Sequence, residues 1–151
     1  MNQPTTLLAQ ALLVDALTHV ASGTFSGVLY AAKVGLIASP YAPNLLSTYA
    51  DMVQPTFPGY AEVAATFVPP FQQPDGSFAT NGGLALFQMT DATVPTTVYG
   101  YYVTDGGMTP KLLWVEMLEA PIGLTSPLQA ILVSAQLALG GTNYGSGTVV
   151  T

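Results

Sequence analysis

The stretch Thr96-Thr-Val-Tyr-Gly-Tyr-Tyr-Val-Thr104, followed by Asp105-Gly-Gly-Met-Thr-Pro110 and then by Lys111-Leu-Leu-Trp-Val-Glu-Met-Leu118, decides the fold class. Its first and last segments are of similar length and are rich in Tyr, Val, Leu and Trp, which are common in strands. The middle segment contains Asp, Gly and Pro, which favour turns. The pattern predicts a hairpin of two antiparallel strands, Thr96–Thr104 and Lys111–Leu118.

Short apolar segments separated by glycines and prolines continue this pattern on both sides of the hairpin. Val28–Ile37 is apolar on both faces, which predicts a central strand. Leu128–Leu139 is also apolar on both faces and is predicted to be a long final strand in a buried position. Tyr60–Phe67 is expected to form a further strand, with Glu62 facing one way and Val63 the other. The chain is therefore expected to be mainly β.

Two local signals lie between these strands. Asn81-Gly82-Gly83 is a favourable hairpin-turn sequence, so two short strands, Ser77–Thr80 and Leu84–Thr90, are predicted around it. Asn44 is a suitable N-cap residue, which predicts a single helical turn at Leu45–Ala50.

The two ends have a different composition from the middle of the chain. In residues 1–24, Leu and Ala recur at helical offsets, which predicts a helix at Thr5–Ala21 with Leu8 and Leu12 on one side. In residues 140–151, four glycines predict a flexible tail, or an arm that orders only on a partner. The remaining residues, 25–139, are expected to form a single β-sandwich or jelly-roll-like domain of about seven or eight strands.

Charged residues are unusually few. A soluble domain of this length would carry roughly 38 of them, at about 25% of residues. This chain carries ten, of which only Lys33 and Lys111 are positive, and its net charge is −6. Such a composition argues against binding to nucleic acid or to anionic lipid, since both depend on basic residues. It also predicts large neutral or apolar surfaces, which usually mark contact with a partner protein.

No apolar run is long enough to cross a membrane. The nearest candidate, Leu7–Val20, is interrupted by Gln10, Asp15 and His19. It also resembles a signal peptide poorly, because no positive charge precedes it. Synthesis in the cytoplasm is the expectation.

The residue types needed for catalysis are scarce. The chain has no cysteine and one histidine, His19, so a catalytic triad or a histidine-based metal site is not expected. Glu116 and Glu119 could form a carboxylate pair of the glycosidase kind, but a solvating role is favoured for them, and a turn-forming role for Asp105. Calcium is a minor alternative without the spacing of a calcium loop. We expect no enzyme, no cofactor and no metal.

Aromatic residues gather in the hairpin. Tyr99, Tyr101 and Tyr102 lie close together, and Trp114 is expected on the partner strand. Tyr and Trp are common in the centres of protein interfaces, so a core or subunit-interface role is favoured over a platform for stacking a sugar ring. These four residues, with Leu8 and Leu12 of the expected helix, are the candidate interface residues.

Four segments carry a resemblance to a known class of proteins. They are Val28–Leu36, Phe57–Tyr60, Thr97–Gly107 and Leu112–Met117. In their order of strands and turns they resemble small β-rich virion proteins of tailed bacteriophages, of the capsid-decoration or minor structural type. The resemblance implies an accessory subunit that coats a larger lattice, commonly as a symmetric oligomer.

The expected function is therefore that of a virion structural protein that assembles through apolar interfaces. Its expected partners are further copies of itself, in a homo-oligomer such as a trimer, and a major capsid or other virion protein. The expected location is the virion, after synthesis in the host cytoplasm. The alternative is a glycan-binding β-sandwich module of a phage or a secreted protein, and a small carboxylate enzyme is a weaker third hypothesis.

Overall fold

The computed structural model describes residues 31–68, 71–72, 74, 78–91, 94–139 and 148–150. These residues form two antiparallel four-stranded sheets and one short 3-10 helix, η1 (Tyr49–Asp51). The described part is thus mainly β, as predicted. The helix expected at Thr5–Ala21, with Leu8 and Leu12, lies outside the described residues.

The first sheet has the strand order β2-β1-β5-β6. Its strands are β1 (Lys33–Ile37), β2 (Val63–Ala64), β5 (Thr96–Thr104) and β6 (Leu112–Leu124). β5 and β6 pair as the predicted antiparallel hairpin, although β6 continues six residues further than expected. β1 lies between β2 and β5, so the predicted central strand is confirmed for its described residues.

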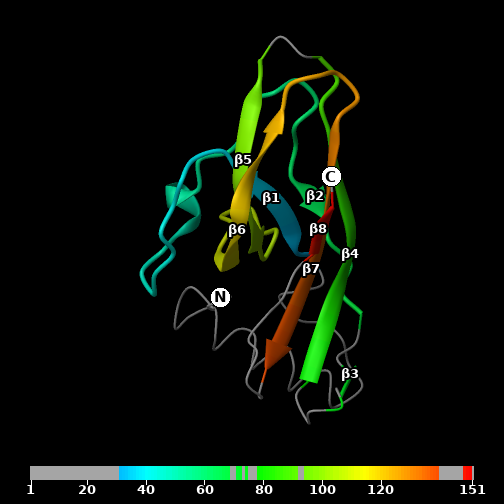
Figure 1. The fold of residues 1–151 in the computed structure, drawn as a ribbon. Coiled ribbons are helices and arrows are strands. Elements are labelled where there is room, and N and C mark those ends of the chain that lie inside the picture. The colour runs from blue at the N-terminus through cyan, green and yellow to red at the C-terminus, as the bar shows by residue number, and fades with distance from the viewer. Residues whose placement is uncertain are drawn as a thin grey trace.

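The second sheet has the order β3-β4-β7-β8. Its strands are β3 (Phe71–Gln72), β4 (Phe78–Gln88), β7 (Ala130–Leu139) and β8 (Thr148–Val150). β7 pairs with both β4 and β8, so it is an inner strand of this sheet. It is not the final strand that was predicted, because β8 follows it. In Figure 1, β4, β7 and β8 lie on one side of the molecule, and β5 and β6 lie on the other.

β8 lies within the segment for which a flexible tail was expected. Thr148–Val150 pair with Leu132–Ser134 of β7, so these three residues are part of a sheet. Valine and threonine favour extended backbone, and the free edge of β7 offers them ladder hydrogen bonds.

The hairpin predicted at Asn81-Gly82-Gly83 is wrong. β4 runs through these residues as one strand of 11, and only its register against β7 shifts between Asn81 and Leu84. This register shift is a β-bulge, and the segment Thr66–Val68 lies against it. The Val68 N–H donates to the Asn81 carbonyl, and the Gly83 N–H donates to the Thr66 carbonyl. A Cβ on Gly82 would lie 3.2 Å from the Phe67 ring. The glycines therefore admit a close neighbour instead of reversing the chain.

Two other predicted elements are shorter or displaced. Of Tyr60–Phe67, only Val63–Ala64 form a strand, and Phe67 makes an isolated bridge to Gly82. The helical turn is η1, which Thr48 and Asp51 cap. The Asn44 side chain instead accepts a hydrogen bond from the Leu46 N–H.

Buried side chains form two clusters, one on each face of the first sheet. The larger cluster lies between the two sheets and includes Val34, Tyr101, Phe87 and Val133. The smaller cluster, which includes Ile37, Met52 and Tyr102, lies on the opposite face of the first sheet. Residues 38–54, hereafter the covering segment, supply Met52, Tyr41 and Tyr49 to it. In Figure 1 this segment is the cyan chain beside β5 and β6.

Candidate interaction surface

Two of the predicted interface aromatics lie in the core between the sheets. Tyr101 is fully buried and Trp114 is only 4% exposed. The Trp114 ring packs edge-on against Phe67 at 5.6 Å between ring centres. The Tyr101 hydroxyl donates a hydrogen bond to the Glu116 carboxylate. As contact residues for a partner these choices are wrong, because the chain itself already covers both side chains.

Tyr102 lies on the opposite face of the first sheet from Tyr101, as the period of two predicts, and it is also fully buried. Its ring lies across β1, where Gly35 is its cross-strand partner. A Cβ on Gly35 would lie 2.2 Å from the Tyr102 ring, so the absence of a side chain there makes room for the tyrosine. The covering segment then closes over the ring, with Tyr49 edge-on at 5.8 Å. Tyr102 is therefore not an interface residue either.

A network of tyrosine hydroxyls around Glu62 fastens the covering segment. Tyr102 donates to Glu62 Oε1 at 2.6 Å. The Tyr60 hydroxyl accepts a hydrogen bond from the Leu36 N–H of β1 at 3.1 Å, and Gln54 donates to the Tyr49 hydroxyl at 2.7 Å. Sequence reasoning missed this network, since Glu62 and Tyr102 are 40 positions apart and no motif links them.

The environment of these tyrosines keeps them protonated. Burial raises the pKa of Tyr102 well above its usual value, and the Glu62 carboxylate and Tyr60 raise it further. Burial is also the largest cause of the raised pKa of Tyr49 and of Tyr60. A phenol with a raised pKa keeps its proton at neutral pH, so its hydroxyl group stays available as a hydrogen-bond donor. The network can thus hold the covering segment in place.

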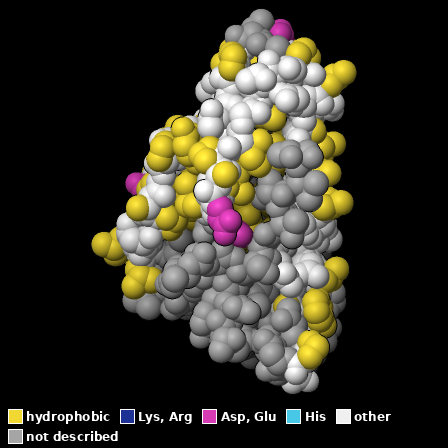
Figure 2. Space-filling model, viewed as in Figure 1, with side chains coloured by type: hydrophobic (Ala, Val, Ile, Leu, Met, Phe, Trp, Pro, Cys, Tyr) yellow, Lys and Arg dark blue, Asp and Glu magenta, His cyan; other side chains and the backbone are white. Residues whose placement is uncertain are grey.

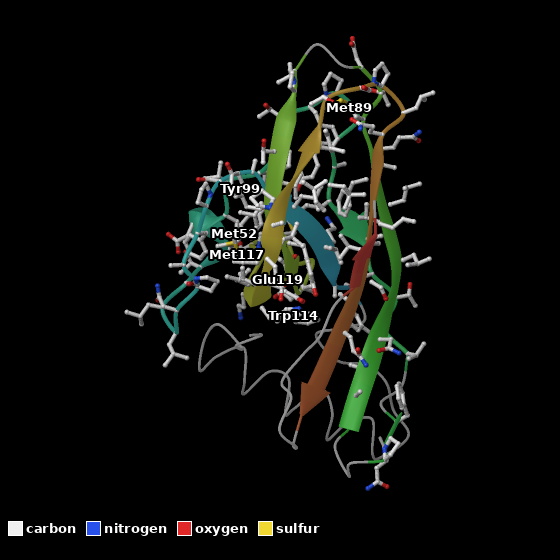
Figure 3. The ribbon with its side chains drawn as sticks, in the orientation of Figure 1. Met52, Met89, Tyr99, Trp114, Met117 and Glu119 are labelled. Carbon is white, nitrogen blue, oxygen red and sulfur yellow. The ribbon has the colours of Figure 1, made fainter. Side chains whose placement is uncertain are left out.

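Tyr99 differs from the other three aromatics because it is partly exposed. The β5–β6 register shifts between Val98 and Gly100, so the regular alternation is interrupted at Tyr99. As a result Val98 and Tyr101, three residues apart, both belong to the core between the sheets. In Figure 3, Tyr99 lies on the side of β5 and β6 where Met52 and Met117 pack beneath the covering segment.

Two of the carboxylates considered for chemistry, Glu116 and Asp105, have structural contacts. Glu116 accepts the Tyr101 hydrogen bond, and Asp105 Oδ1 accepts from the Gly107 and Lys111 N–H groups, as expected of a turn residue. Within the described residues, no group of three or more His, Asp or Glu side chains could hold a metal ion. No helix found in that part of the chain is both long and apolar enough to span a membrane.

The outer face of the second sheet carries exposed leucines. Leu84 is 70% exposed and Leu86 is 50% exposed, whereas the alternate residues Ala85 and Phe87 are buried in the core. On β7, Leu132 is the cross-strand partner of Leu86, and Ser134 that of Leu84. Figure 2 shows hydrophobic side chains along the edge of the molecule where β4 lies in Figure 1. We call this surface, formed by Leu84, Leu86, Gln88, Ala130, Leu132 and Ser134, the outer leucine face.

Charged residues are absent from the strands that carry this face. The sequences of β3, β4, β7 and β8 contain no Asp, Glu, Lys, Arg or His. By contrast, the edge strand β6 of the first sheet carries Glu116, Glu119 and Pro121. Edge charges and prolines commonly protect a sheet from joining another chain. The described strands of the second sheet have no such charge or proline, and its edge strands β3 and β8 are instead short.

Other exposed apolar side chains lie elsewhere. Leu45, Leu46 and Val53 project from the covering segment, on the far side of the first sheet from the outer leucine face. Met108 and Leu128 lie in the turns that follow β5 and β6. Phe71 of the short edge strand β3 is 43% exposed, and Val68 and Val94 lie in segments between strands. Among the described residues, Leu84 and Leu86 are the exposed large apolar side chains that alternate along one strand, where a flat partner surface could cover them together.

No protein-family model matches the chain, and no curated protein or solved structure is significantly similar to it. Its function therefore has to be inferred from its own residues.

Proposed function

We propose that the chain is a structural subunit, built on a β-sandwich domain, that assembles through apolar contacts. Its setting would be the one that the sequence resemblance implies, a decoration or minor structural protein of a virion. The observation that carries the proposal is the outer leucine face, which exposes Leu84 and Leu86 on a sheet whose described strands have no charge. Apolar surface of this kind usually marks a site of protein contact.

Covering these leucines would stabilise an assembly. Full burial of a leucine contributes about 1.5–3 kcal/mol, so covering the exposed part of each contributes on the order of 1 kcal/mol. Because no charge of the second sheet takes part, the contact should depend little on salt, unlike an association steered by charges.

The mass of the purified chain in solution tests this function. We expect sedimentation or light scattering to detect oligomers at some chain concentration between about 1 μM and about 1 mM. This range covers dissociation constants that differ by about 4 kcal/mol in association free energy. Raising the salt from low to molar concentration should change the dissociation constant less than tenfold. A chain that stays monomeric over the whole range would contradict the proposal.

The glycan-binding alternative loses its main support, since Tyr101, Tyr102 and Trp114 are buried. Only Tyr99 of that group keeps a partly exposed side chain, and a single ring is a small platform. Titration of Trp114 fluorescence with sugars would test what is left of this hypothesis. A saturable change at millimolar sugar would restore it.

A further inference from the structure

We infer that the outer leucine face binds the same face of a second copy of the chain, so that two second sheets stack face to face around a twofold axis. This inference rests on the proposed function and names the surface and the partner through which assembly begins. It commits to a symmetric contact, in which every residue of the face meets the same set of residues in the other copy.

The first reason is the shape of the face. Cross-strand rows on it are Leu84 with Ser134, Leu86 with Leu132, and Gln88 with Ala130. Leu132 of β7 therefore lies between two small residues of the same strand, Ala130 and Ser134. Large side chains beside small ones let two sheets interdigitate, and face-to-face packing is the usual way for a sheet to cover an apolar face.

The second reason is electrostatic. The chain has a net charge of −6, so two copies repel each other unless their carboxylates stay apart. The described carboxylates, such as Glu62, Glu116 and Glu119, lie on the first sheet or in segments between strands. A basic partner would find no carboxylate in the strands of the second sheet with which to pair. A neutral apolar surface is the better complement, and a second copy supplies one.

The size of the contact sets its expected strength. β4 has 11 residues and β7 has ten, while β3 and β8 are short. Two strands about 33 Å long and about 10 Å wide offer at most about 350 Å² per copy, and the outer leucine face takes about half of that length. A pair would bury at most about 700 Å², which is less than the roughly 1,200–2,000 Å² of stable complexes. The dimer should therefore be weak and reversible, as suits a subunit that is held by several contacts at once.

A charge placed on the face tests the inference. Leu86→Lys would put two lysines near each other in the dimer, so we expect the dissociation constant measured by sedimentation to rise at least tenfold. The matched control is Leu46→Lys, because Leu46 is 84% exposed on the covering segment at the opposite side of the molecule. Leu46→Lys should leave the dissociation constant within twofold of that of the unmodified chain. Circular dichroism of both variants checks that they fold.

Crosslinking gives a second readout that does not depend on the lysine variant. The natural chain has no cysteine, so Leu86→Cys has one thiol at a known place. Treatment with a short bis-maleimide should give covalent dimers from Leu86→Cys and few from Leu46→Cys at the same concentration.

The outcomes separate this inference from the proposed function. If the unmodified chain forms oligomers that resist Leu86→Lys, and Leu86→Cys does not crosslink above its control, then the face is wrong and the assembly function stands. If the unmodified chain stays monomeric up to about 1 mM, then both the inference and the proposed function are wrong.

Discussion

The two sheets of this protein bury different numbers of faces. The first sheet has one face against the second sheet and the other beneath the covering segment, so Tyr101 and Tyr102 are both fully buried although they point in opposite directions. The second sheet has one buried face, with Phe87 and Val133, and one face on which Leu84 and Leu86 remain exposed. The described part of the chain covers much of both faces of the first sheet, but only one face of the second.

The difference lies in what holds the cover in place. On the first sheet, Gly35 makes room for the Tyr102 ring, and Glu62 accepts the hydrogen bond of its hydroxyl. The outer face of the second sheet has leucines and small residues without a described segment across them. A covered face contributes to the stability of the single chain, whereas an uncovered apolar face contributes only when a partner arrives.

The largest expected effect follows from removing the ring beneath the cover. Tyr102→Ala should lower the free energy of unfolding by about 3–5 kcal/mol, because it leaves a large cavity under the covering segment. Urea unfolding at neutral pH measures this. Leu86→Ala, on the uncovered face, should lower it by less than about 1 kcal/mol at protein concentrations where the chain is monomeric. Equal losses for the two variants would contradict the distinction between the faces.

The next effect is steric and tests whether Gly35 is required for the cover. Gly35→Ala would place a methyl group 2.2 Å from the Tyr102 ring, so the ring or the strand must shift. A cost of about 1–3 kcal/mol is expected for such overpacking. Gly123→Ala in β6 of the same sheet is the control, since nothing lies within 4 Å of its Cβ position. Thermal unfolding of the two variants should give clearly different midpoints.

A smaller effect is expected from the hydroxyl network. Tyr102→Phe keeps the ring and removes the hydrogen bond to the Glu62 carboxylate, which should cost about 1–2 kcal/mol. Glu62→Gln keeps an acceptor for the hydroxyl and should cost less. If Tyr102→Phe is neutral in urea unfolding, the covering segment is held by apolar packing alone.

The same network predicts how stability depends on pH. The pKa of Tyr102 and of Tyr101 is raised in the folded chain, mainly by burial, from an ordinary value of 10.0. Below pH 10 both states keep these protons, so these tyrosines add no pH dependence there. Above pH 10 the unfolded chain loses protons that the folded chain keeps, so the free energy of unfolding should fall as the pH rises. Denaturation curves measured between pH 8 and 12 give the free energy of unfolding at each pH. This free energy should fall less steeply with pH in Tyr102→Phe than in the unmodified chain.

The smallest effect on stability is expected on the outer leucine face. Leu84→Ser removes a side chain that is 70% exposed, so the unfolding free energy of the monomer should change by less than about 0.5 kcal/mol. Its effect should be seen in solubility and self-association instead. A loss of stability above 2 kcal/mol, measured at a concentration without dimers, would mean that this face is covered within the single chain.

Local patterns predicted the strands well where neighbours in sequence are also neighbours in the sheet. The β5–β6 hairpin was found because its turn and both strands are contiguous, and β5 has the predicted bounds Thr96–Thr104. Asn81-Gly82-Gly83 misled because a turn and a bulge use the same residues. What distinguishes them is the Thr66–Val68 segment, more than ten positions away, which hydrogen-bonds to the bulge.

The sequence by itself determined the mainly β class, the central position of β1, the hairpin and the scarcity of charge, because composition and a period of two are local properties. Whether an aromatic residue is core or surface was decided by the folded chain. Tyr102 is buried because Gly35, Tyr49 and Glu62 meet it from three separate segments. Leu84 and Leu86 are exposed because no described segment crosses their side of the sheet. Burial depends on which segments meet in space, and that is a property of the whole fold.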